Sequence, residues 1–143
     1  MIGDELVLAY ATTNFCVSDG DIEFVLGVGK HSLELEALYR STGNQQAAYV
    51  TAYNPHSKSL TEIENMQRHE ALLRRLSNRW PVYNGSGEDV HGKWPPEKSL
   101  LILGISLVDA LSLGSEFAQN AIVYCEQTAI PRLYLCDSNT PIA

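Results

Sequence analysis

Residues 100–105 read Leu-Leu-Ile-Leu-Gly-Ile, an almost purely apolar run with polar sequence on its N-terminal side. A short apolar run of this kind is typical of a β-strand that is buried on both faces. Such a strand lies in the interior of a sheet whose two faces are covered by other elements. The run therefore predicts a sheet with residues 100–105 near its centre and with helices packed on it.

The remaining periodicity and capping signals predict further helices and strands around this one. Ser32 and Ser106 are expected helix N-caps, and the longest helix begins with one of two overlapping capping boxes, Ser59 with Glu62 or Thr61 with Glu64. Glycines and prolines make 81–96 loop-like. The expected helices are 6–11, 32–39, 61–79 and 107–119, and the expected strands are 14–18, 22–28, 47–53, 100–105, 121–125 and 132–136. This order indicates an α+β or α/β fold with a mixed sheet.

A chain of 143 residues with 45% apolar and 19% charged residues has the size and composition of one globular domain. We expect a single domain over 1–143, with 139–143 as a frayed tail. Ten Lys and Arg against seventeen Asp and Glu give a net charge of −7, which argues against general binding to nucleic acid or to a membrane. The apolar stretch 100–113 is interrupted by Asp109 and is shorter than the roughly 20 residues of a membrane span.

The cysteines and the N-terminus point to the cytoplasm. Cys16, Cys125 and Cys136 form no disulfide or zinc pattern, so we expect three reduced, buried thiols. The first five residues lack the basic segment of a signal peptide. The sequence lacks a complete phosphate loop, a nucleophile elbow and the zinc-deaminase signature. The four histidines show no metal-ligand spacing, and His69 fits a hydrogen-bonded core position. We therefore expect no metal and no cofactor.

Arg68, Arg75 and Arg79 share one face of the helix expected at 61–79. This face is interpreted either as a binding stripe for phosphate or carboxylate groups or as a solvated face whose cations suit the helix C-terminus.

Polar residues gather where the expected strands and helices end, and such positions often hold ligands. Glu97 and Glu64 are the candidate catalytic acids or bases, because a carboxyl group near Trp94 and prolines can have a raised pKa. The candidate ligand-binding residues are Tyr53, Asn54, Asn65, Trp94, Gln119 and Asn120. The structural alternative is that Asn54 fixes a turn, Glu64 closes a capping box and Gln119 with Asn120 ends a helix.

The same polar residues carry a resemblance to a known family. The chain resembles the small bacterial proteins of domain-of-unknown-function family 3293 over residues 51–123. The resemblance is carried by Thr51-Ala52-Tyr53-Asn54-Pro55 with Ser57, Glu64-Asn65, Gly85-x-Gly87-x-Asp89, Trp94-Pro95-x-Glu97-x-Ser99 and Phe117-x-Gln119-Asn120-Ala121. Ala118 stands where the family pattern leads us to expect glycine, and Pro96 is an additional proline. The resemblance implies a single-domain fold and a common polar set, and it implies no reaction.

Two functions remain open at this point, and the sequence does not decide whether the protein is an enzyme. The first is the binding of a small molecule, with nucleotide-like molecules included, in a polar pocket that could also perform metal-independent acid–base catalysis. The alternative is a non-enzymatic protein–protein interaction module, with a homodimer as one form of it.

Overall fold

The computed structural model describes residues 3–137 and 141–142, apart from the side chain of residue 4. The helices are α1 (Asp4–Ala11), α2 (Leu33–Thr42), α3 (Glu62–Arg75) and α4 (Leu107–Glu116), with a short 3-10 turn, η1, at Pro55–Ser57. The strands are β1 (Asn14–Asp19), β2 (Ile22–Leu26), β3 (Ala47–Thr51), β4 (Val82–Glu88), β5 (Glu97–Leu103), β6 (Ala121–Cys125) and β7 (Arg132–Leu135).

The seven strands form one curled sheet in the order β2-β1-β4-β5-β3-β6-β7. This arrangement confirms the predicted α+β fold and places β5, with its apolar run, in the middle of the sheet. The expectation of a mixed sheet is wrong in one respect, because every pairing between these strands is antiparallel. Loops between antiparallel strands need no crossover helix, which explains why β1 and β2, and β6 and β7, follow each other directly.

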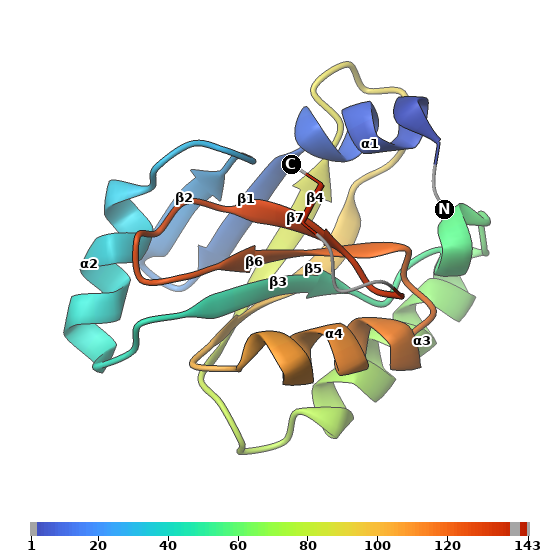
Figure 1. Cartoon of the computed structure of the whole chain (residues 1–143). Helices are drawn as coiled ribbons and strands as arrows, with labels where there is room; N and C mark the ends of the chain where they lie inside the picture. Colours follow the sequence, from blue (N-terminus) through green and yellow to red (C-terminus); the bar gives the residue numbers. More distant parts are fainter. Residues whose placement is uncertain (1–2, 138–140, 143) are drawn as a thin grey trace.

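The helices divide between the two faces of the sheet (Figure 1). On one face, α2 buries Leu35, Leu38 and Tyr39 against side chains such as Leu101 and Leu103 of β5. On the other face, α3 and α4 pack on the alternate residues of the same strand, Leu100 and Ile102. Both faces of β5 are thus covered, as the apolar run predicts.

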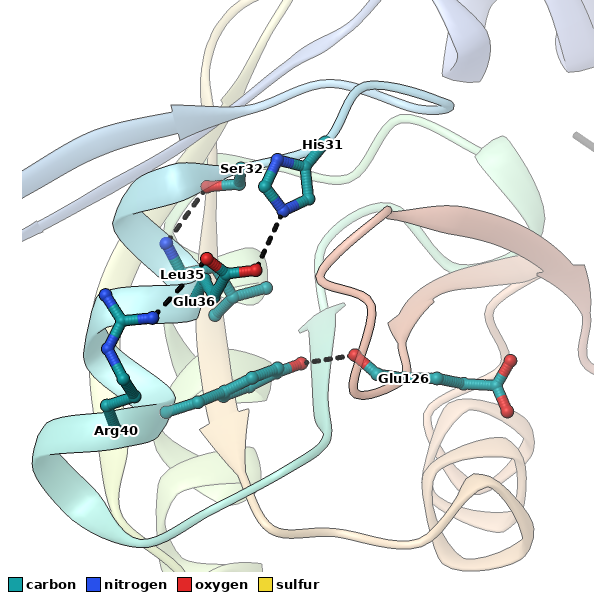
Figure 2. A network of polar contacts seen from close by, with 7 residues as sticks. His31, Ser32, Leu35, Glu36, Arg40 and Glu126 are labelled. Carbon is teal, nitrogen blue, oxygen red and sulfur yellow. Dashed lines mark hydrogen bonds and ion pairs between the residues drawn. The ribbon is translucent and has the colours of Figure 1, made fainter.

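The start of α2 is fixed by its cap and by charged contacts (Figure 2). Ser32 Oγ accepts a hydrogen bond from Leu35 N at 3.0 Å, as expected for an N-cap. Glu36 lies between His31 and Arg40, with N···O distances of 3.1 and 3.4 Å, and these two partners lower the pKa of its carboxyl group. These contacts are exposed and local, so they contribute little to the stability of the fold.

Strand β4 was not predicted, because Gly85 and Gly87 make its sequence resemble a loop. The segment 82–88 pairs with β1 on one side and β5 on the other, and only 89–96 connects β4 to β5 without a strand. A Cβ atom on Gly85 would lie 2.4 Å from Cys16 O and 2.7 Å from Tyr49 Oη. Glycine is required here because the neighbouring strand and the Tyr49 ring approach the backbone closely.

Of the two capping boxes expected at the start of the longest helix, the structure contains the one formed by Thr61 and Glu64. Thr61 is the N-cap of α3, and its side chain and Glu64 form both hydrogen bonds of the box. The helix ends at Arg75, four residues before the predicted end.

Part of the expected tail is paired with the sheet. Pro141 forms a bridge with Tyr134, and Ile142 N donates to Leu133 O at 2.8 Å. Residues 139, 140 and 143 of that expectation lie outside the described residues. Within the described part of the chain, none of the helices combines the length and apolar character that a bilayer crossing requires.

Candidate functional site

A cavity of about 310 Å³ lies between α1 and the face of the sheet that also carries α2. We call it the α1 cavity. Its wall on the helix side consists of Leu6, Ala9, Tyr10 and Thr13, and its sheet side includes Phe15, Tyr49, Thr51, Gly87, Ser99, Val123 and Leu133. Glu97, the first residue of β5, and residues from the connecting segments complete the lining, namely Tyr53, Asn54, Ser57, Ser59, Trp94 and Gln119. The cavity thus has an apolar majority and a group of polar side chains from the loops.

Asn54 holds Glu97 in place at the edge of this cavity. The Asn54 Nδ2 amide donates to Glu97 Oε2 at 2.6 Å. Asn54 Oδ1 accepts from Leu60 N at 3.0 Å and from Asn65 Nδ2 at 2.8 Å, and Asn54 N donates to Asn65 Oδ1 at 2.8 Å. With its side-chain oxygen occupied by two donors, Asn54 can offer Glu97 only its amide hydrogens.

The Glu97 carboxyl is only partly accessible to solvent, and burial raises its pKa above the usual value. The hydrogen bond from Asn54 acts in the opposite direction but is the smaller effect. Among the described residues, no Lys, Arg or His forms an ion pair with Glu97. Glu97 is therefore a carboxyl group that can take up or release a proton closer to neutral pH than an exposed glutamate does.

Tyr10 of α1 brings a hydroxyl group to the same region. Burial raises the pKa of Tyr10, and the negative charge of Glu97 raises it further. The polar side chains of Ser57 and Asn120 act against this increase. Tyr10 thus brings a neutral hydroxyl to the surroundings of Glu97.

The backbone beside the cavity is strained at four positions. Asn54, His56, Ser57 and Ala118 have positive φ angles of 46°, 50°, 61° and 56°. His56 N donates to Ala118 O at 2.7 Å, so the two strained segments support each other. Strain of this kind persists only where the surrounding structure enforces it, and it is common at binding sites. The glycine that the family pattern leads us to expect at position 118 would adopt this conformation without a Cβ penalty.

Gln119 and Arg68 join the end of β3 to the end of α4. Gln119 Nε2 donates to Tyr53 O at 3.0 Å and to Phe117 O at 3.3 Å. Arg68 Nε donates to Ala52 O at 2.6 Å, and its Nη2 also donates to Phe117 O. These bonds satisfy backbone carbonyls that leave a strand and a helix end.

The other two arginines of the predicted binding stripe also have partners within the protein. Arg75 Nε pairs with Glu116 Oε1 at 3.1 Å, and the Arg79 guanidinium lies 4.4 Å from the centre of the Trp80 ring. With Arg68 bonded to backbone carbonyls, the three side chains act as structural contacts in this structure.

Five of the eight predicted site residues line the α1 cavity: Tyr53, Asn54, Trp94, Glu97 and Gln119. Asn65 is buried behind Asn54 and supports it, and Asn120 Nδ2 donates to Ser57 Oγ at 3.1 Å. Glu64 does not line the cavity, since its carboxylate accepts from Thr61 N and Oγ1 in the capping box at 3.0 and 2.9 Å. These hydrogen bonds lower the pKa of Glu64.

Several lining residues were missed by the sequence analysis. Tyr10 belongs to α1, for which the sequence offered only an apolar pattern, and Thr13 follows the end of that helix. Ser59 was considered only as a helix cap. Ser57 and Ser99 do appear in the family pattern, which is the one signal that could have added them to the predicted set. Tyr49 lies within a strand, and nothing in its local sequence distinguishes it from a core residue.

His69 is buried as predicted, but the predicted hydrogen bond is absent, because its ring forms no hydrogen bond with the described residues. Among the described residues, its Nδ1 atom has no hydrogen-bond partner. Burial lowers the pKa of His69, and nearby Lys98 lowers it further, so the ring is neutral. In the part of the chain that the structure describes, no group of three or more His, Cys, Asp or Glu side chains could hold a metal ion.

The fold and the cavity define a small α+β protein in which loops after β3, before β5 and after α4 meet around a partly buried carboxyl group. Residues 50–122 match a family model described as "Protein of unknown function (DUF3293)". The match covers just over half of the chain, and the chain belongs to this family. All eight predicted site residues lie within the matched segment, whereas α1 precedes it. No curated protein and no solved structure matches the chain.

Proposed function

We propose that the protein binds a small organic molecule in the α1 cavity and that Glu97 is its main polar contact. The position of Glu97 supports this proposal most directly. Asn54 fixes this carboxyl group on the lining of a cavity of about 310 Å³. This volume is at the lower end of the range for ligand pockets, which is roughly 300–1,000 Å³. The mostly apolar lining with a few converging polar groups is also typical of such pockets.

Glu97 is also the group we propose for acid–base chemistry, if the bound molecule reacts. Burial raises the pKa of Glu97 toward neutral pH, which is the direction that favours general acid–base catalysis. Glu64 has no comparable support, because its oxygen is engaged in the capping box and its pKa is lowered. The proposal therefore assigns this role to Glu97 alone.

The alternative of an interaction module has less support. The most exposed large apolar side chains are Ile63, Val108, Leu33 and Leu8, and they belong to four different helices. Protein-binding surfaces are more often contiguous apolar patches.

A cavity-filling variant tests the proposal. Ala9→Trp places a large ring into the cavity from α1, whereas Leu8→Trp places the same ring on the neighbouring, largely exposed position. Each protein is incubated with a small-molecule cell extract, separated from unbound material and analysed by native mass spectrometry. We expect the wild type and Leu8→Trp to retain a small molecule that Ala9→Trp does not retain. Retention by none of the proteins, or equal retention by Ala9→Trp, would contradict the proposal.

A further inference from the structure

We infer that the α1 cavity takes an organic amine, whose apolar body packs against the sheet and whose ammonium group binds Glu97. The inference rests on the proposed function and adds the chemical class of the bound molecule. It follows from the charge of the lining, from the division of the lining into apolar and polar parts, and from the unused hydrogen-bonding capacity around Glu97.

The charge of the lining favours a cation. Among the described residues that line the cavity, Glu97 is the only Asp, Glu, Lys, Arg or His. A phosphate or carboxylate group would therefore enter a partly desolvated space with a carboxylate and without a positive side chain, which is unfavourable. A nucleotide bound through its phosphate does not fit this lining, and an ammonium group would supply the missing counter-charge.

The apolar part of the lining favours an organic body on the same molecule. The apolar lining residues that keep accessible surface are Leu6, Ala9 and Trp94, whereas Phe15, Val123 and Leu133 behind them are already buried in the core. A small inorganic cation would leave this surface uncovered. Burying hydrocarbon there contributes roughly 25 cal/mol per Å² of apolar area removed from water.

The polar part of the lining offers acceptors to an ammonium group. Glu97 Oε2 accepts from Asn54, whereas no described residue donates a hydrogen bond to Glu97 Oε1. The hydroxyl oxygens of Tyr10 and Ser57 lie in the same lining. An ammonium group has three donors and no acceptor, so one carboxylate oxygen and neighbouring hydroxyl oxygens satisfy it. Hydrogen bonds between two ionised groups are also stronger than neutral ones.

The experiment compares amines with uncharged and anionic molecules that have the same ring. The probes are 2-phenylethylamine, 2-phenylethanol and phenylacetate, and tryptamine, tryptophol and indole-3-acetate. Binding of each probe is measured at neutral pH by isothermal titration calorimetry. We expect each amine to bind about tenfold more tightly than the alcohol with the same ring. The carboxylate should be the weakest member of each set.

Two variants assign the preference to the cavity. Glu97→Gln retains an acceptor for Asn54 and removes the charge, so it should reduce the advantage of the amine to about threefold or less. Glu88→Gln removes one negative charge at an exposed position of β4 outside the lining and should leave the order of affinities unchanged. Ala9→Trp should weaken every probe and thereby verifies that the probes occupy the cavity.

An alcohol or carboxylate that binds as tightly as its amine, an unchanged amine preference in Glu97→Gln, or no binding by any probe would overturn the inference. The proposed function is judged separately by the extract experiment. If the retained molecule has no amino group, the proposed function is supported and the inference that the cavity binds an amine is wrong.

Discussion

The Asn54 side-chain amide donates a 2.6 Å hydrogen bond to Glu97 Oε2 across forty-three positions of the sequence. The register of the sheet explains the encounter. Thr51 of β3 lies opposite Ser99 of β5 in an antiparallel pair, so the residues that follow Thr51 approach those that precede Ser99. The pairing of two central strands therefore brings the turn residue and the carboxyl group together.

The stability of the protein should depend on pH through Glu97. Burial raises the pKa of the Glu97 carboxyl group in the folded state. At pH values between the unfolded and the folded pKa, the folded protein therefore holds a proton that the unfolded chain has released. Folding should become less favourable as the pH rises from the usual glutamate pKa through the raised one. Glu97→Gln removes this loss and preserves an acceptor for Asn54. Urea unfolding between about pH 4 and about pH 7 should show the variant gaining stability relative to the wild type as the pH rises. Parallel curves would contradict the assignment.

Asn54→Ala should lower the free energy of unfolding by about 1–3 kcal/mol, because the backbone and side-chain partners of Asn54 lose their hydrogen bonds. Asn78→Ala is the matched control. Asn78 has a similar φ of 59°, is exposed and makes no side-chain hydrogen bond among the described residues. The control should cost less than Asn54→Ala in chemical denaturation. Equal losses would mean that backbone strain, and not the hydrogen-bond network, accounts for the effect.

Ala118→Gly should stabilise the protein by up to about 1 kcal/mol. Ala118 has φ +56°, and a left-handed conformation costs a residue with a Cβ roughly 1–2 kcal/mol. Part of this gain is lost because glycine increases the entropy of the unfolded chain. Ala47→Gly, at a buried position in β3, is the control. It increases the entropy of the unfolded chain in the same way but relieves no backbone strain, so it should destabilise the protein. Thermal unfolding of both variants measures the contrast, and the prediction is wrong if both lose stability equally.

The three thiols should react slowly in the folded protein. Burial raises the pKa of Cys125 and of Cys136 to about 12 and raises that of Cys16 as well. All three cysteines are free. A thiol reagent at neutral pH should therefore label three groups after denaturation and few before it, because the thiolate is the reactive form. Cys16 is half-buried with the smaller shift, so Cys16→Ser should remove the fastest native reaction. Rapid labelling of that variant would contradict the expected order.

Much of the fold follows from local sequence signals. The apolar run of β5 and the Ser32 and Ser106 caps each depend on neighbouring residues, and the structure contains all of them. Strand β4 was missed because glycines at 85 and 87 have no local strand preference. The requirement for glycine at position 85 comes from Cys16 and Tyr49, which are distant in sequence, and a local pattern cannot express it.

The candidate site was predictable to a similar extent. Polar residues at the ends of strands and helices indicated Tyr53, Asn54, Trp94, Glu97 and Gln119, which share the lining of one cavity. Glu64 has the same polar character, but it satisfies its own helix end. The contribution of Tyr10 depends on where α1 packs, and the packing position of an isolated amphipathic helix is a tertiary property.

The cavity lining has a kinetic consequence, because it is drawn from segments as distant in the sequence as α1, β3, β5 and β7. Such a lining is complete only after strands far apart in the chain have paired, which is a late event in folding. A molecule that binds this cavity therefore stabilises the finished protein but not the partly paired chain. Its presence should slow unfolding and leave the rate of folding unchanged.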